Sequence, residues 1–390
     1  TVMTYNDLSA INGFSPRNKG NNGYLKNIGA FDIAAIQYLY GANTDKNTEN
    51  NIYRLQSLND KYGFECIWDN GGVDVITAEG ESDSVSIDLR NATLDTAAGG
   101  GGFVSQYSSQ YNGYTIAFNS TGNCIIENAI GGSADDTLRG NSSSNKLMGG
   151  SGEDIIYGEA GNDLIFGNAG DDTIHGGSGV DTASGYSSTI YDYSIWKNYE
   201  NENVIIKDKT SNRDGKDILF PDMEKVLFSN GKSFNVSELR SGLINKESIG
   251  YQLIGNSDLI TLRHGNGGTL SDSSTSKWDV IAAKQTSTGF DVLFQGGGTM
   301  DGKNMIWSTN GSGTYVSGTS WMTDAVTVAN GYENTFAQDL DSDGLLSGGS
   351  FYQLASDSGA VTLRHGSGGT LSDSSTSKWD VIAAKQTSTG

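Results

Sequence analysis

The strongest constraint on how this chain folds is a nine-residue pattern that repeats six times without a break between residues 131 and 184. Each copy begins with glycine, carries aspartate or asparagine at its sixth position and has an aliphatic residue at its eighth. A strand repeats its facing every two residues and a helix every 3.6, so a period of nine indicates one small unit stacked on copies of itself. A flexible linker of the same composition has no reason to keep aliphatic residues in phase. We therefore predict a six-residue turn and a three-residue strand in each copy, with one ladder of core residues: Leu138, Leu147, Ile156, Ile165, Ile174 and Ala183.

The sixth positions place acidic side chains on two edges of this predicted coil. Successive turns must lie on opposite edges, which groups Asp136, Asp154 and Asp172 on one edge and Asn145, Asp163 and Asp181 on the other. Carboxylates at about 5 Å, the spacing of adjacent strands, repel one another unless a cation neutralises them. Ca²⁺ fits best, because it accepts about six to eight oxygens, including backbone carbonyls, whereas Mg²⁺ keeps its waters. We predict several calcium ions held by these six side chains and by the glycine turns at Gly150, Gly152, Gly161, Gly170, Gly177 and Gly179.

The second copy of the pattern, GNSSSN, departs from the others. It lacks two glycines and carries Asn145 in place of aspartate, so we expect the site that uses this turn to be weak or empty. Calcium binds the folded coil and hardly binds the open chain, so it stabilises the fold by linkage. We therefore expect the acidic segment to be unfolded at cytosolic calcium and folded at millimolar calcium.

The nonapeptide pattern resembles the repeat-in-toxin (RTX) family, which implies a calcium-bound parallel β-roll. A roll that folds only at high calcium suits a chain that passes unfolded through a narrow exporter and folds outside the cell. This implies a type I secretion exporter as a partner and an extracellular location.

Composition limits the other partners. The chain has 46 acidic against 25 basic residues and a net charge of −21, which argues against binding to nucleic acid or anionic lipid. No apolar run approaches the roughly 18 residues of a membrane span, and the N-terminus lacks the features of a cleavable signal. Cys66 and Cys124 allow one disulfide or two buried free thiols.

The segment before the repeats contains a short predicted helix. In AFDIAAIQYLYGAN, residues 30–43, Ile33, Ile36, Leu39 and Tyr40 fall on one stripe and Gly41 supplies the end. Together with TVMTY at the N-terminus, WDNGGVD at 68–74 and IIENAIGG at 125–132, this segment resembles the serralysin family of secreted zinc metallopeptidases over about residues 1–240.

The serralysin resemblance implies two residue roles. Met3 would be the methionine of the Met-turn beneath the catalytic zinc, and Tyr5 the tyrosine close to that zinc. The first residue is threonine, so we expect a processed chain or a piece of a longer one.

The zinc ligands of such an enzyme are missing from this sequence. They lie in His-Glu-x-x-His on a helix, with a third histidine in the extended motif. The three histidines, His175, His264 and His365, have no such context. We therefore expect Zn²⁺ and cleavage of protein substrates only in an intact enzyme whose catalytic helix lies upstream, and no proteolysis by the chain as it stands. The alternative is a non-enzymatic secreted calcium-binding adhesin or matrix protein.

Two further acidic turns are candidate calcium sites. Asp69 and Asp74 flank a glycine pair in WDNGGVD, which fits either a calcium site or an ordinary turn. Residues 339–344 match the first half of an EF-hand loop, but its twelfth position is Ser350 and not an acid, so we expect a weak site or an acidic interdomain turn. The three carboxylates of that loop are Asp339, Asp341 and Asp343.

A second, longer repeat follows the coil. The 39 residues from Tyr251 recur from Tyr352, and the segments WDVIAAK and FDVLFQG predict strands. This part resembles a tryptophan-rich repeat found at the C-termini of some bacterial RTX proteins. Its aromatic residues could pack in a core or, if exposed, bind carbohydrate: Trp278, Trp307, Trp321 and Trp379.

These observations predict a mainly β fold, with a parallel β-roll flanked by β-sandwich-like segments and a short helical remnant of a metalloprotease domain at the N-terminus. Val226, Phe228 and Phe234 should cover the last coil. The predicted domains are a catalytic-domain remnant at 1–45, a β-rich connection at 46–130, the roll at 131–185, a β-rich cap at 186–247, one tryptophan-rich repeat at 248–349 and a truncated second at 350–390.

Overall fold

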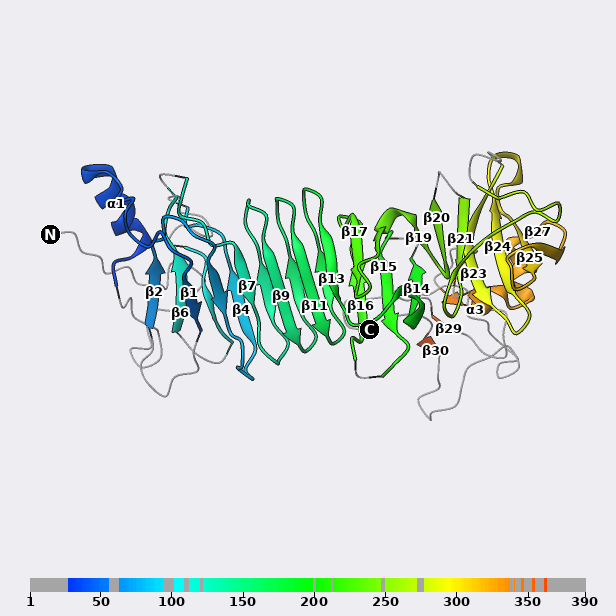
Figure 1. Cartoon of the computed structure of the whole chain (residues 1–390), viewed down its shortest axis with the longest axis horizontal. Coiled ribbons are helices and arrows are strands. Elements are labelled where there is room, and N and C mark those ends of the chain that lie inside the picture. Colours follow the sequence, from blue (N-terminus) through cyan, green and yellow to red (C-terminus); the bar gives the residue numbers. More distant parts are fainter. Residues whose placement is uncertain are drawn as a thin grey trace, which may run out of the picture. The chain divides into compact units, whose positions relative to one another are not determined.

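The computed structural model describes most of the chain between residues 27 and 346 (Figure 1). The described ranges are 27–55, 63–93, 102–108, 112–119, 122–198, 201–211, 213–246, 250–271, 277–336, 338, 340, 345–346, 353–354 and 361–362. The predictions for Met3, Tyr5, Trp379, Asp339, Asp341 and Asp343 lie outside the described residues. The chain divides into two compact units, residues 1–188 with 210–233 and residues 189–209 with 234–390.

The first unit is a coil made of two sheets whose strands alternate along the sequence (Figure 1). The first sheet is parallel and runs in the order β1 (Ile52–Arg54), β3 (Val75–Thr77), β7 (Asn128–Ile130), β9 (Lys146–Ser151), β11 (Leu164–Ala169), β13 (Thr182–Tyr186) and β17 (Lys225–Phe228). The second runs in the order β16 (Lys216–Leu219), β12 (Thr173–His175), β10 (Ile155–Tyr157), β8 (Thr137–Arg139), β4 (Val85–Asp88), β5 (Ser105–Tyr107), β6 (Asn112–Ile116) and β2 (Gly63–Ile67). The predicted parallel β-roll is confirmed.

One side chain per strand forms the core of the roll. The six predicted ladder residues have no exposed surface, and each stacks on its equivalent eighteen residues away, as Ile156 does on Leu138 and Ile174. The ladder continues into strands outside the nonapeptide run through Ile76, Ile87, Ala129, Leu219 and Val226, which are equally buried. Burying one Leu or Ile contributes roughly 1.5–3 kcal/mol, so a core that is one residue wide gives modest stability per turn.

The C-terminal end of the roll is closed by β17. Val226 pairs with Ala183 of the last repeat, and the ring of Phe228 lies 5.2 Å from that of Tyr186. These positions agree with the predicted cover over the last coil. Phe234 is also buried. It lies in β18 (Ser233–Asn235), of which the first residue belongs to the first unit and the other two to the second unit.

Helix α1 (Ala30–Tyr40) forms where the sequence predicts it and ends at Gly41, whose N–H donates to the Gln37 carbonyl at 2.9 Å. The predicted contact stripe is right at Ile33, which is buried, and at the half-buried Ile36, but wrong at Leu39 and Tyr40. Leu39 and Tyr40 are 63% and 84% exposed, and the buried stripe runs through Ala30, Ile33 and Gln37. The helix is apolar on nearly every side, so hydrophobic periodicity alone could not identify the packed face.

Cys66 and Cys124 are buried free thiols, one of the two arrangements that the sequence allows. Burial raises the pKa of Cys66 to about 12 and that of Cys124 to about 11, so neither forms a reactive thiolate near neutral pH. No helix in the described ranges is long and apolar enough to cross a membrane.

The second unit is built of antiparallel strands. Its sheets contain β14 (Tyr193–Lys197) with β15 (Val204–Asp208); β19 (Leu239–Arg240), β20 (Leu243–Lys246), β21 (Gly250–Ile254) and β22 (Leu259–Thr261); and β23 (Trp278–Gln285), β24 (Phe290–Gly296), β25 (Lys303–Thr309), β26 (Tyr315–Gly318) and β27 (Met322–Thr323). Helices α2 (Asp324–Ala329) and α3 (Tyr332–Phe336) follow, and the short strands β28 (Leu345–Leu346), β29 (Gln353–Leu354) and β30 (Val361–Thr362) form a separate sheet.

The core of the second unit is thick and aromatic. The strands predicted for WDVIAAK and FDVLFQG are confirmed as β23 and β24. Phe290 and Phe294 are buried at the centre, and the partly buried Trp278, Trp307 and Trp321 pack against their cluster. Trp278, Trp307 and Trp321 therefore contribute to packing.

Candidate metal centre

The sixth-position side chains form two columns, one along each edge of the roll. In each column the backbone N–H of one residue donates to the side-chain Oδ1 of the residue eighteen positions later. On one edge Asp136 donates to Asp154 at 2.8 Å and Asp154 to Asp172 at 2.9 Å. On the other edge Asn145 donates to Asp163 at 2.7 Å and Asp163 to Asp181 at 2.8 Å. The structure therefore brings together the residues that the sequence assigns to each edge.

The five column carboxylates are buried, and four of them are only half satisfied, whereas Asp136 accepts the Val85 N–H at Oδ1 and the Gly132 N–H at Oδ2. Their exposed fractions lie between 0% and 2%. One oxygen, Oδ2, has no hydrogen-bond partner in Asp154, Asp163, Asp172 and Asp181. A buried ionised group without a partner is costly, so these oxygens need a cation or a proton.

The pKa values of the column acids also indicate that these groups need a cation or a proton. Burial raises the pKa of Asp154 to about 8 and that of Asp163 and Asp172 to about 7, and backbone N–H donors only partly oppose the shift. Neighbouring acids in each column raise the values further. Near neutral pH these carboxylates are thus poised between binding protons and binding a metal.

The glycines of the repeat make room for this arrangement. A Cβ on Gly149, the first residue of its repeat, would overlap Oδ2 of Asp154, so the carboxylate occupies space that only glycine leaves free. Gly152 has φ +115°, and a Cβ there would lie 2.5 Å from the Ala134 carbonyl carbon in the turn below. Positive φ occurs at all the glycines assigned to the turns: Gly150, Gly152, Gly161, Gly170, Gly177 and Gly179.

This donor set suits a hard cation. Stacked turns bring carboxylate oxygens and main-chain carbonyls close together, which are the ligands that Ca²⁺ prefers. Among the described residues no three His, Cys, Asp or Glu side chains gather closely enough to hold a metal by themselves. A cation in this roll would therefore take most of its shell from backbone carbonyls, which zinc sites do not do.

Asn145 differs from the acids around it. Its Oδ1 accepts the Asn141 N–H at 2.8 Å, and its Nδ2 donates to the Glu127 carbonyl at 2.9 Å. The amide is neutral and its groups are occupied within the protein. This supplies a physical reason for the expectation that its turn binds calcium weakly.

Asp69 and Asp74 also come together, at the N-terminal end of the roll. Neither has exposed surface. The Tyr53 hydroxyl donates to Asp69 Oδ2 at 2.6 Å, while Asp74 Oδ1 accepts the Asn51 N–H at 2.7 Å and Asp74 Oδ2 has no partner. Burial raises the pKa of Asp74 to about 7, and the charges of Asp69 and Glu127 add to the shift. The pair thus resembles the column acids in burial and in its unpartnered oxygen.

Glu127 is a column residue that the sequence analysis missed. Its Oε2 accepts the Asp74 N–H at 2.7 Å, the same relation that joins the acids within each column. The two residues are 53 positions apart, so a search for a period of nine or eighteen does not find them.

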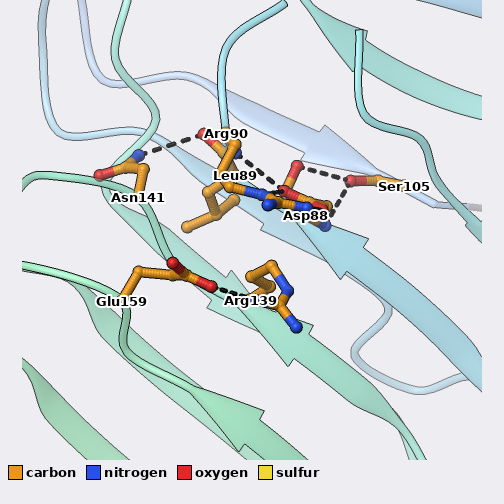
Figure 2. Close-up of polar contacts among 7 residues, drawn as sticks. All are labelled: Asp88, Leu89, Arg90, Ser105, Arg139, Asn141 and Glu159. Carbon is orange, nitrogen blue, oxygen red and sulfur yellow. Dashed lines mark hydrogen bonds and ion pairs between the residues drawn. The ribbon is translucent and has the colours of Figure 1, made fainter. Parts of the chain in front are cut away.

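Two acidic residues outside the columns, Asp88 and Glu159, have basic partners (Figure 2). Asp88 accepts hydrogen bonds from Arg90 at 2.6 and 2.9 Å, and Arg139 pairs with Glu159. Asp88 also lies beside Ser105, whose Oγ accepts the Asp88 N–H at 2.9 Å. These two charges are therefore compensated by the protein itself, unlike those of the column acids.

His175 is a packing residue. Its ring stacks 4.8 Å from that of Tyr157 and lies 3.7 Å from that of Phe220 on the outer face of the roll. Neither it nor His264, which contacts the ring of Trp307 at 5.7 Å, belongs to a cluster that could hold a metal among the described residues.

Comparison with known proteins identifies two regions. Residues 130–165 and 148–183 match the RTX calcium-binding nonapeptide repeat, and residues 242–348 match the tryptophan-rich Synechocystis species C-terminal domain. Serralysin of Proteus mirabilis is 41% identical over 79 residues, which is 17% of this chain and 16% of that protein. The calcium-binding nature of the repeats and the tryptophan-rich domain are thus confirmed, while the match to serralysin covers less than a fifth of either chain.

Proposed function

We propose that this chain is part of a secreted protein whose parallel roll folds when it binds calcium outside the cell. The observation that carries the proposal is the set of four buried carboxylates whose Oδ2 atoms have no partner: Asp154, Asp163, Asp172 and Asp181. Without a cation, the folded coil must hold these groups protonated or pay their electrostatic cost. Calcium removes this cost and gives the coil most of its stability.

The calcium ligands in this proposal are the six sixth-position side chains and the carbonyls of the glycine turns between them. Asp69 and Asp74 form a further site of the same kind, supported by their burial and by the unpartnered Asp74 Oδ2. Because calcium binds the folded chain alone, each site stabilises the fold by RT ln(1 + [Ca²⁺]/Kd). A chain of this kind stays unfolded at cytosolic calcium, which suits passage through a type I exporter.

The test is a calcium titration of the whole chain followed by circular dichroism. We expect the β signal to rise cooperatively as calcium rises toward the millimolar range and to fall back, when EDTA is added, to the level that the second unit contributes. Magnesium at the same concentration serves as the control and should not replace calcium, because it keeps its waters. Equal β structure with EDTA and with calcium would contradict the proposal.

A second candidate function is supported by the partial identity to serralysin and by the surface of α1. Helix α1 leaves four large apolar or aromatic side chains exposed: Phe31, Tyr38, Leu39 and Tyr40. Exposed apolar side chains in this number fit an interface with another domain. On this hypothesis the chain is the C-terminal part of a serralysin-like zinc metalloendopeptidase, whose zinc and catalytic helix belong to an upstream domain that covers α1.

The two forms of the proposal are distinguished by the residues encoded immediately before Thr1. A His-Glu-x-x-His helix there, with caseinolysis by the longer protein, supports the peptidase. If no such motif precedes the chain, the protein is a non-enzymatic calcium-binding adhesin or matrix protein. The chain as it stands should bind no zinc and cleave no casein in either case.

A further inference from the structure

The C-terminal end of the roll contains a turn that the nonapeptide run does not supply. The chain leaves the first unit after residue 188 and returns at residue 210. Strand β16 then pairs in parallel with β12, Ile218 beside Thr173 and Leu219 beside Ile174. In this register Asp217 takes the sixth position, 45 residues after Asp172, where a seventh repeat would have placed its acid.

The returning segment reproduces the contacts of a regular turn. The Asp172 N–H donates to Asp217 Oδ1 at 3.2 Å, as Asp154 donates to Asp172. The Lys216 N–H donates to Asp171 Oδ1 at 3.0 Å, just as the Glu153 N–H does to Asp135 Oδ1 at 2.8 Å one turn earlier.

The backbone of this segment matches as well. Gly215 has φ +75°, and a Cβ there would overlap the Gly170 carbonyl oxygen, in the same way that a Cβ on Gly170 would overlap the Gly152 carbonyl oxygen. The Gly170 carbonyl therefore faces the returning segment at close range.

Two acids at this end, Asp172 and Asp217, are buried without basic partners among the described residues. Asp172 and Asp217 are 1% and 3% exposed, and Asp172 Oδ2 has no hydrogen-bond partner. Neither forms an ion pair within the described ranges, because Lys216 reaches outward to Asp171 at 3.4 Å. Asp214 is also buried, but its carboxylate accepts hydrogen bonds from the N–H and the hydroxyl of Ser187.

We propose that Asp172 and Asp217 bind a further calcium ion at this end of the roll, with the Gly170 carbonyl at the same site. This inference rests on the proposed function and adds a ligand, Asp217, that lies outside the residues that match the RTX repeat, which end at residue 183. Its ligands come from two segments, residues 170–172 and residue 217. Between these segments the chain leaves the first unit and returns to it. The ion therefore acts as a latch that holds β16 on β12 and closes the coil only when calcium is present.

The other edge ends differently. The Asp181 N–H donates to Glu224 Oε2 at 2.7 Å, and Glu224 is partly exposed whereas Asp217 is buried. A partly solvated, longer side chain has less need of a cation. The latch is thus assigned to the Asp217 edge.

The test uses the variant Asp217→Asn in the full chain, because asparagine keeps the Oδ1 acceptor for the Asp172 N–H and removes the charge. Native mass spectrometry counts bound calcium, and amide exchange reports protection of β16, β9 and β11. We expect one ion fewer per chain and a calcium midpoint at β16 raised roughly tenfold, with the protection of β9 and β11 close to wild type. Glu153→Gln is the matched control, since Glu153 is an exposed acid of the preceding turn on the same edge, and it should keep the wild-type count and midpoint.

An unchanged calcium count and an unchanged midpoint at β16 in Asp217→Asn would overturn the proposal. Loss of calcium protection along the whole coil would also overturn it, because Asp217 would then have a general structural role. If wild-type β9 and β11 show no response to calcium, the proposed function itself fails, so the two failures are distinguishable.

Discussion

The two units of this chain are stabilised in different ways. The roll buries one aliphatic side chain per strand and two columns of carboxylates, whereas the second unit buries a cluster of aromatic and aliphatic residues around Phe290 and Phe294. Hydrophobic burial is intrinsic to the chain, but the buried charges of the roll require a cation from outside. On the proposed function, calcium dependence is therefore expected of the roll and not of the second unit.

The pH dependence of the two units should differ most. In calcium-free protein the pKa of Asp154 is about 8 and those of Asp163 and Asp172 are about 7, all raised by burial. The folded roll thus binds protons more tightly than the unfolded chain, so its stability is greatest below about pH 4 and is lost as pH rises through 7 to 8.

With the three shifts acting independently, we expect the free energy of unfolding of the calcium-free roll to fall by about 7 kcal/mol between pH 5.5 and 8.5. Urea unfolding after dialysis against calcium-free buffer measures it, with amide exchange in β10 and β24 reporting each unit separately. A roll whose stability stays constant or rises over this range would show that the column acids are not protonated in the folded state.

A cavity introduced by mutation into each core compares the calcium dependence of the two units. Ile156→Ala in the roll and Phe294→Ala in the second unit should each cost about 3 kcal/mol, because both side chains are fully buried. Calcium can offset the loss of stability only in Ile156→Ala, because in this account only the roll binds calcium. If about four ions bind as the roll folds, its calcium midpoint should rise roughly three- to fivefold, while excess calcium leaves Phe294→Ala unstable.

Thermal unfolding at a series of calcium concentrations measures both variants. Recovery of Phe294→Ala by calcium to the same degree as Ile156→Ala would mean that the two units depend on calcium alike.

The smallest effect is expected from Asn145→Asp. This change gives the weak turn the carboxylate that the other repeats have, in a column that already contains Asp163 and Asp181. We expect a calcium midpoint lowered by about twofold and lower stability without calcium, since one more buried charge must then be neutralised. Isothermal calorimetry measures the change, and Asn162→Asp, on an exposed side chain of the next turn, is the control. An unaltered midpoint would remove Asn145 from the set of ligands.

The sequence allowed the regular part of the roll to be predicted residue by residue. A strict period places Ile156 in the core and Asp154 on an edge without further information, because every copy confirms the phase of the others. The strands β23 and β24 could be predicted as well, because alternating apolar and polar residues and flanking turn residues indicate them.

The remainder could not be predicted for physical reasons. Glu127, Asp217 and Glu224 hold column positions, but they follow their neighbours after 53, 45 and 43 residues and carry no periodic signal. The contact face of α1 was predicted wrongly at Leu39 and Tyr40, because these side chains are as apolar as the residues that are buried. In both cases tertiary pairing, and not local pattern, decides the position.

The most direct test of the central claim is amide hydrogen exchange of the whole chain with 5 mM calcium and with excess EDTA, a range set by the roughly millimolar affinity of extracellular calcium modules. The account predicts that β9, β10 and β11 lose nearly all protection in EDTA at pH 8, while β23, β24 and β25 keep theirs. Equal protection of the roll under both conditions would contradict the account, since its buried carboxylates would then be stable without a cation.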